Sequence, residues 1–200
     1  MRIVIIEFIS LDGVVQAPGG ADEDTDGGFA HGGWSHPFFD ETVGGGFNEA
    51  LTKADGLLFG RRTWQTMAAA WPERAGDPFA DRMNSIPKHV VSATLGDDEL
   101  TWNNTTRIPG DRAVARIREL RETDGGDLVV MGSATLARTL LSEGLVDELR
   151  LLIEPVILGG GKTIFPSDGA SQTLELVSTE TSGTGVHVTT YRPVAAGSSA

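Results

Sequence analysis

Short apolar runs alternate with segments of helical periodicity along most of the chain. The apolar runs, bounded by turn residues, predict strands at residues 3–9, 55–60, 86–94 and 127–132, with a shorter one near 100–102. Between them, apolar residues recur three and four positions apart, as Trp64, Met67, Ala68 and Trp71 do. This spacing predicts helices at residues 38–54, 61–71, 111–124 and 134–143. Such alternation is typical of an α/β fold with a largely parallel sheet.

The last quarter of the chain has a different pattern. Residues 147–158 read as an apolar strand that contains Pro155, which predicts an edge or a bulge because proline has no N–H to donate. Residues 173–193 alternate apolar and polar side chains on both sides of Gly183–Gly185, as a β-hairpin does. We therefore expect a mixed, mostly parallel central sheet flanked by helices and completed by a C-terminal antiparallel hairpin. A single domain would span residues 1–193, with a flexible tail at 194–200.

Glycines interrupt the pattern at informative places. Residues 18–36 are rich in Gly, Asp and Pro without periodicity, which predicts a long loop of the kind that is usually functional or mobile. Gly44, Gly45 and Gly46 lie inside the predicted helix 38–54. Each costs about 1 kcal/mol relative to alanine. Either the helix breaks there, or another element packs closely against its backbone.

Composition narrows the classes of function. The net charge of −12 and a pI near 4.6 argue against nucleic acid and anionic membrane surfaces as partners. The absence of cysteine excludes disulfides, thiolate metal sites and cysteine nucleophiles. The N-terminal segment has no signal-peptide pattern, and no apolar stretch is long enough to span a membrane, so we expect a cytoplasmic protein.

The stretch "ILGGGKTIFP" (residues 157–166) resembles the end of a phosphate-binding P-loop. A P-loop needs an earlier glycine, which would fall at Val156, and a helix after the Lys-Thr pair, which Pro166 stops. We therefore interpret these glycines as a turn at the end of a strand and Lys162 as a solvated turn residue.

Two other turns place a glycine between a strand and a helix. One is Gly60 with Arg61, Arg62 and Thr63; the other is Gly132 with Ser133, Ala134 and Thr135. Each brings free helix N–H groups to the carboxyl end of a strand, where open α/β sheets bind anions. Ser133 is also the expected N-cap of its helix, and Gly144 its expected stop. Together the turns predict a ligand with phosphates in two places, such as a dinucleotide.

An ordered series of motifs then resembles a known family. "SLDG", "GGWSHPFFDE", "GRRTW", "VVSAT", "VVMGSATLARTLL" and "VDELRLLIEPVILGGGKTIFP" follow one another between about residues 2 and 192. This order resembles the dihydrofolate-reductase-like superfamily. It is most similar to the branch related to the C-terminal reductase domain of riboflavin biosynthesis. The resemblance implies an oxidoreductase that works as a homodimer.

The resemblance also implies where NADPH would lie, across the carboxyl ends of the central strands. The Gly60–Thr63 turn would face the phosphates, and the Gly132–Thr135 turn would take the pyrophosphate and the nicotinamide side. Ser92, Ala93 and Thr94 would hold the adenosine and its 2′-phosphate. The acidic residue that binds a pterin cannot be placed on the first helix, so folate is not the expected substrate.

Hydride transfer from a nicotinamide needs alignment, a dry pocket and a source of protons. Asp12 and Glu154 are the candidate catalytic acids, although Asp12 also fits a turn and Glu154 a paired buried carboxylate. Asp40 and Glu41 are either substrate contacts or N-terminal helix acids. Trp34, Phe38 and Phe39 form either an aromatic wall for a planar substrate or core packing. No metal site is expected, because His31, His36 and Asp40 lack convincing spacing.

The sequence thus predicts an NADPH-dependent reductase of a small heterocyclic or carbonyl/imine substrate. The activity would be similar to that of the pyrimidine reductase of riboflavin biosynthesis or of dihydrofolate reductase. Two alternatives stay open: a nucleotide-binding module without catalysis, and a reductase that uses flavin or a deazaflavin.

Overall fold

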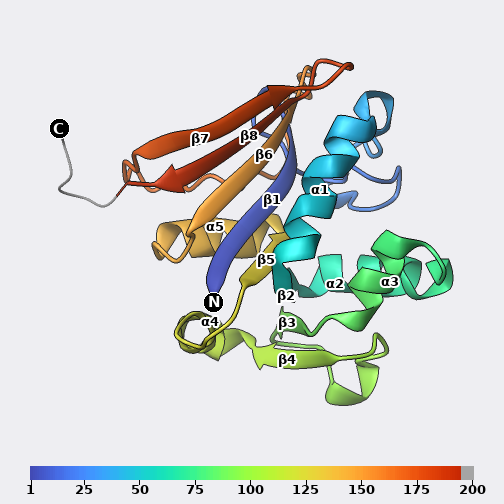
Figure 1. The fold of residues 1–200 in the computed structure, drawn as a ribbon, viewed down its shortest axis with the longest axis vertical. Helices are drawn as coiled ribbons and strands as arrows, with labels where there is room; N and C mark the ends of the chain where they lie inside the picture. The colour runs from blue at the N-terminus through green and yellow to red at the C-terminus, as the bar shows by residue number, and fades with distance from the viewer. Residues whose placement is uncertain (195–200) are drawn as a thin grey trace.

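One mixed sheet organises the computed structural model, which describes residues 1–194 (Figure 1). Its eight strands lie in the order β4-β3-β2-β5-β1-β6-β8-β7. The pairs from β4 to β6 are parallel, and β6-β8-β7 are antiparallel. The strands are β1 Arg2–Ser10, β2 Ala54–Gly60, β3 Lys88–Ser92, β4 Thr105–Pro109, β5 Asp127–Met131, β6 Glu148–Glu154, β7 Leu174–Thr181 and β8 His187–Pro193. The predicted fold class, hairpin included, is confirmed; residues 195–200 of the predicted tail lie outside the described residues.

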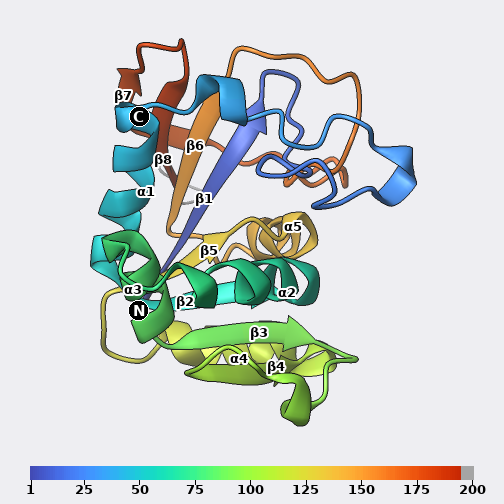
Figure 2. The same cartoon turned by 90° about the vertical axis from the view of Figure 1, so that its right-hand side faces the viewer.

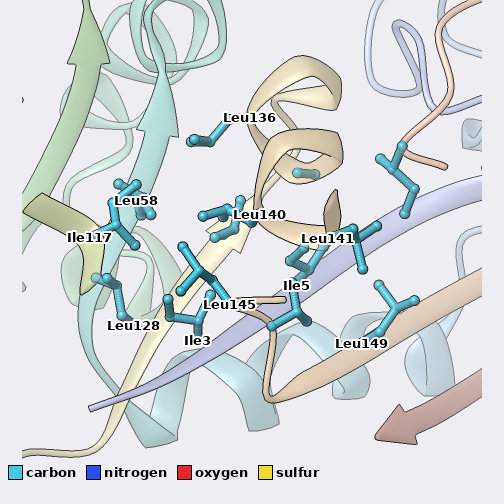
Figure 3. Packing of buried hydrophobic residues seen from close by; sticks show 14 of the residues in the cluster. Ile3, Ile5, Leu58, Ile117, Leu128, Leu136, Leu140, Leu141, Leu145 and Leu149 are labelled. Carbon is cyan, nitrogen blue, oxygen red and sulfur yellow. The ribbon is translucent and has the colours of Figure 1, made fainter. Parts of the chain in front are cut away.

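Helices cover both faces of the sheet (Figures 1 and 2). They are α1 Glu41–Lys53, α2 Arg61–Ala70, α3 Pro78–Ser85, α4 Ala113–Arg121 and α5 Ala134–Ser142. The core of one face joins α4 and α5 to β1, β2 and β5, where Leu140 and Leu141 lie beside Ile3 and Ile5 (Figure 3). The core of the other face joins α1, α2 and α3 to the same strands. Within residues 1–194, no helix has the length and apolarity needed to cross a membrane.

Three local expectations were wrong. Residues 100–102 are not a strand; a 3-10 turn at Asp97–Glu99 leads instead to β4. Pro155 does not lie within an edge strand, because β6 pairs with both β1 and β8 and ends one residue before the proline. Helix α3 was missed, although its N-cap Asp77 and the proline after it are a standard helix start.

The lengths of the central strands create an opening. Strand β1 pairs with β5 only as far as Ile6, which lies opposite Met131. On its other side β1 continues beside β6 up to Ser10, which lies opposite Glu154. From Glu7 onward, one edge of β1 therefore has no strand beside it. In open α/β sheets, ligands bind at such a crevice at the carboxyl ends of the strands.

Helix α1 runs unbroken through its three glycines. A Cβ built on Gly46 would lie 3.4 Å from a methyl carbon of Val188, so this glycine lets the helix approach the sheet closely. A Cβ on Gly44 would lie 3.4 Å from the Phe39 ring, while one on Gly45 would meet nothing within 4 Å. Close packing thus explains two of the three glycines.

Gly45→Ala is expected to stabilise the protein, because alanine restricts the unfolded chain and fills only open space. The free energy of unfolding should rise by about 0.5–1 kcal/mol in urea denaturation. Gly46→Ala is the matched control and should gain less, since its methyl group would press on Val188. Equal gains from both changes would contradict this account of α1.

Candidate active site

A cavity of about 880 Å³ opens at the crevice beside β1. Its volume is within the usual range for small-molecule sites. The lining comes from β1, the loop after it, the turns that lead into α2 and α5, and the facing sides of α1, α2 and α3. The structure thereby brings together segments that are more than a hundred residues apart in the chain.

The two predicted phosphate-binding turns meet in this cavity. All of Gly60, Arg61, Arg62 and Thr63 line it, as do residues 132–135. The backbone N–H of Gly60 donates to Ser133 Oγ over 2.8 Å, which ties one turn to the other. Ser133 is therefore not the side-chain cap that the sequence suggested, because its hydroxyl bonds the backbone of Gly60 at the end of β2 and not an N–H of α5.

The helices that begin at these turns have no side-chain caps. Neither α2 nor α5 has its first N–H groups bonded by the N-cap side chain. In contrast, Asp40 caps α1 and Asp77 caps α3, each by accepting a backbone N–H. Uncapped N-termini attract anions through free N–H groups and the helix dipole. The turns therefore fit the phosphates of a dinucleotide.

Backbone strain also gathers at the cavity. Of the three non-glycine residues with positive φ between residues 1 and 194, Ala17 (50°) and Ser133 (67°) line it. Gly132, next to Ser133, has φ of 63°. A Cβ on Gly132 would lie 3.0 Å from a methyl carbon of Thr63. Strained backbone is typical of ligand sites, where the surrounding structure holds it in place.

The predicted adenosine segment does not line the cavity. Ser92 is buried, and its Oγ accepts the backbone N–H groups of Thr94 and Leu95, so it closes the turn after β3. Ala93 and Thr94 are exposed beside this turn. These residues lie at a strand end as predicted, but β3 is separated from the crevice by β2 and β5.

Asp12 is also outside the cavity lining. Its carboxylate accepts the backbone N–H groups of Leu158 and Gly159 over 3.1 and 2.8 Å, and the Ser10 hydroxyl over 2.6 Å. These bonds, that of Ser10 first, lower the pKa of Asp12 to about 2. Asp12 thus anchors the glycine turn after β6, and the structure does not place it in the lining of the cavity.

Glu154 is fully buried and likewise does not line the cavity. Ser35 Oγ donates to its Oε1 over 2.6 Å, and no described group bonds its Oε2. Burial raises the pKa of this carboxyl to about 7. Glu154 is the buried carboxyl that the sequence suggested, but its one hydrogen-bond partner among residues 1–194 is Ser35 of the loop.

The three predicted substrate contacts separate in the structure. Only Phe39, which is 57% exposed, lines the cavity. Trp34 is buried, and its indole N–H donates to the carbonyl of Gln16 over 2.7 Å, so it supports the loop. Asp40 caps α1 by accepting the Val43 N–H, which lowers the pKa of Asp40.

Sequence reasoning missed Glu7, a buried acid that lines the cavity. It is only 2% exposed, and no described group bonds its Oε1. Burial raises the pKa of Glu7 well above its usual range, while the Gly132 backbone N–H lowers it and Glu23 adds to the rise. The signal was a single acid inside the apolar run "IVIIEFI", the same signal that drew attention to Glu154.

A charged cluster joins the long loop to the other walls of the cavity (Figure 2 shows the loop after β1 beside the segment after β6). Asp24 and Asp26 both pair with Lys162, and Asp26 also pairs with Arg62. Lys162 is therefore not a free turn residue. The buried amide of Gln16 accepts the Lys162 N–H and donates to the carbonyls of Asp24 and Asp26. These contacts hold the loop across the cavity.

Comparison with known proteins identifies the family of the chain. The family model for the RibD C-terminal domain matches residues 2–188. The chain belongs to the RibD C-terminal domain family. The match confirms the resemblance seen in the motifs, and because this is a reductase family it supports an oxidoreductase.

A relative in the family is the uncharacterized protein YyaP of Bacillus subtilis, 28% identical over 92% of this chain and 91% of its own. A putative riboflavin biosynthesis protein from Shewanella sp. PV-4 shares the fold with a TM-score of 0.74 and 21% identity, over 97% of this chain and 99% of that one. Dihydrofolate reductase from Enterococcus faecalis, solved with NADP(H), has a TM-score of 0.59 and 17% identity, over 96% of each chain. At these identities the solved structures establish the fold.

The glycine turn after β6 has one position that admits no side chain. A Cβ on Gly161 would lie 2.6 Å from a methyl carbon of Val14, whereas one on Gly160 would meet nothing within 4 Å. Both residues have positive φ, so the strain of substitution is similar. Gly161→Ala should lower the free energy of unfolding by about 1–3 kcal/mol more than Gly160→Ala does. Urea denaturation measures the difference, and equal losses would mean that the turn does not pack on Val14 as described.

Glu154→Gln tests the buried carboxyl. In the folded state Glu154 keeps its proton up to about pH 7, whereas the unfolded chain loses it near 4.5. The free energy of unfolding of the native protein should therefore fall between these pH values, by at most about 1.4 kcal/mol per pH unit. Glutamine does not titrate, so its free energy of unfolding lacks this loss. The difference in free energy of unfolding between the variant and the native protein should therefore grow by about 1–3 kcal/mol in favour of the variant from pH 5 to pH 8. A difference that does not change with pH in urea denaturation would contradict the assignment.

Proposed function

We propose that this member of the RibD C-terminal domain family is an NADPH-dependent reductase of a small planar substrate. The observation that carries the proposal is the meeting of two uncapped helix N-termini at one cavity. Two anion-binding turns facing one space match a dinucleotide better than a ligand with a single phosphate group.

The cofactor half of the cavity would use the turns that lead into α2 and α5. The backbone N–H groups after Gly60 and Gly132 would face the phosphates, helped by Arg61, Arg62 and the Thr63 hydroxyl. The small side chains of Ser133 and Ala134 leave the backbone of the second turn open to close approach. A reduced nicotinamide bound there would supply the hydride.

The substrate half would lie between α1 and the α2–α3 segment. The rings of Phe8 and Phe47 pack in a tilted arrangement with centroids 4.7 Å apart, and those of Trp71 and Phe79 with centroids 5.2 Å apart. All four line the cavity with Met67 and Met83. Aromatic and methionine surfaces suit a flat, largely apolar ring. This supports a small heterocycle or a conjugated carbonyl or imine as the class of substrate.

A charge placed at one helix start tests the cofactor site. Thr135→Glu puts a carboxylate at the second residue of α5. The helix dipole stabilises a negative charge there, but the carboxylate repels a bound phosphate. Thr42→Glu makes the same change at the second residue of α1, outside the cavity, and is the matched control. The dissociation constant of NADPH, measured by calorimetry, should rise at least about tenfold in Thr135→Glu, a change of about 1.4 kcal/mol or more. It should change less than about twofold in Thr42→Glu; equal effects in both variants would place the phosphates elsewhere.

Thermal shift with NADPH, NADH, FMN and ATP separates the alternatives. A ligand at one hundred times its dissociation constant stabilises the fold by about 2.7 kcal/mol, so a bound cofactor is visible. A shift with FMN and none with NADPH would favour the flavin alternative. NADPH that binds but is never oxidised by pteridines, pyrimidinones or enones would favour a binding module without catalysis.

A further inference from the structure

We propose that Glu7 is the catalytic acid of this site: it holds the proton that the substrate takes up on reduction and releases it when the nicotinamide beside it becomes cationic. The inference rests on the proposed function and adds the residue that couples proton transfer to hydride transfer. None of the acids singled out from the sequence reaches the cavity with a free carboxyl oxygen.

The position of Glu7 carries the proposal. It is the first residue of β1 beyond the last pair with β5, so its side chain lies where the sheet edge opens. The carboxyl group faces the Gly132 turn at the start of α5, and its Oε1 has no partner among the described residues. A buried, unpartnered polar atom on the wall of a cavity is costly unless a ligand completes its hydrogen bonds.

Two buried carboxyls with an unbonded oxygen allow a direct comparison. Glu7 and Glu154 are both less than 3% exposed, and burial raises the pKa of each. Glu154 bonds Ser35 and lies outside the cavity lining, whereas Glu7 belongs to that lining. Of these two carboxyls, only Glu7 borders the space in which a molecule would bind.

The other charged groups at the cavity do not offset the effect of burial, which raises the pKa of Glu7. Glu23 raises the pKa of Glu7 and the Gly132 N–H lowers it, but burial is the largest effect. Glu23 itself accepts the Gly19 N–H over 2.8 Å. In the charged cluster, Asp24 and Asp26 together balance the charges of Arg62 and Lys162. The charged residues that line the cavity besides Glu7 are Asp22, Glu23, Asp24, Arg61, Arg62, Arg74 and Lys162.

The proposed step balances with a reduced nicotinamide dinucleotide as the reductant. The electrophilic carbon of a C=O, C=N or conjugated C=C bond accepts the hydride, and the oxygen, nitrogen or second carbon accepts the proton. The O–H bond of Glu7 breaks as the new bond to hydrogen forms. The products are the reduced substrate, the oxidised dinucleotide and the Glu7 carboxylate, which then regains a proton from water.

The change of charge on the nicotinamide explains why the proton leaves at that moment. A cation nearby favours the carboxylate, so NADP⁺ lowers the pKa of Glu7, while uncharged reduced nicotinamide does not. By linkage, the affinity for NADP⁺ must improve as Glu7 ionises. NADP⁺ and NADPH carry the same phosphate groups. A change in phosphate ionisation with pH therefore affects both affinities equally and cancels when the affinity for NADP⁺ is divided by that for NADPH.

Calorimetry without any substrate tests this coupling. The dissociation constants of NADP⁺ and NADPH are measured between pH 5.5 and 9 for the native protein, Glu7→Gln, Glu7→Asp and Glu154→Gln. In the native protein the affinity for NADP⁺ relative to NADPH should rise about tenfold or more with pH. The rise should vanish in Glu7→Gln, remain in Glu154→Gln and return in Glu7→Asp, which keeps a titrating carboxyl.

The outcomes separate the two proposals. If both dinucleotides bind and their ratio is independent of pH in the native protein, Glu7 is not the acid, while the proposed function stands. If neither dinucleotide binds, the proposed function fails and the role of Glu7 with it. A rise that survives in Glu7→Gln, or that Glu154→Gln also abolishes, overturns the assignment to Glu7. The native protein decides the first two outcomes even where a variant does not fold.

Discussion

The candidate site depends on a difference in strand length: β5 ends opposite Ile6 of β1, and β1 runs on beside β6 alone. Where β5 stops, the chain turns through Gly132 and Ser133 into α5, and the space beside β1 is left open. The cavity, the uncapped start of α5 and the place of Glu7 at the unpaired edge of β1 all follow from this one feature. Without it, β1 would be buried on both edges and the site would be core.

The loop after β1 completes the cavity through polar contacts. Gln16 bonds three backbone groups, and two aspartates pair with cations from α2 and from the glycine turn after β6. Asp12 fixes the same turn from the other side. The turn that resembles a P-loop thus positions the loop over the cavity, while the helix N-termini without side-chain caps at the cavity are those of α2 and α5. The glycine turn after β6 therefore has a structural role, and the uncapped helix starts lie in other parts of the fold.

Sequence patterns predicted the fold and two of the turns that line the cavity, because both depend on local signals. The strand–glycine–helix turns at Gly60 and Gly132 are contiguous segments, and their residues do line the cavity. The proposed acids Asp12 and Glu154 were chosen by position along a strand, which does not tell which face or edge a side chain uses. Glu7 has the same sequence signal as Glu154, and only the pairing of β1 with β5 distinguishes them.

By itself the sequence determined the alternating strands and helices, the hairpin, the glycine turns and the family, because these depend on periodicity, turn chemistry and motif order. The tertiary structure alone decided which carboxyl faces the cavity, which helix starts stay uncapped and what Lys162 binds. These properties arise from contacts between segments up to about 150 residues apart, such as Asp12 with Gly159. Strand register and strand length set such contacts, and neither is written in the local pattern of polar and apolar residues.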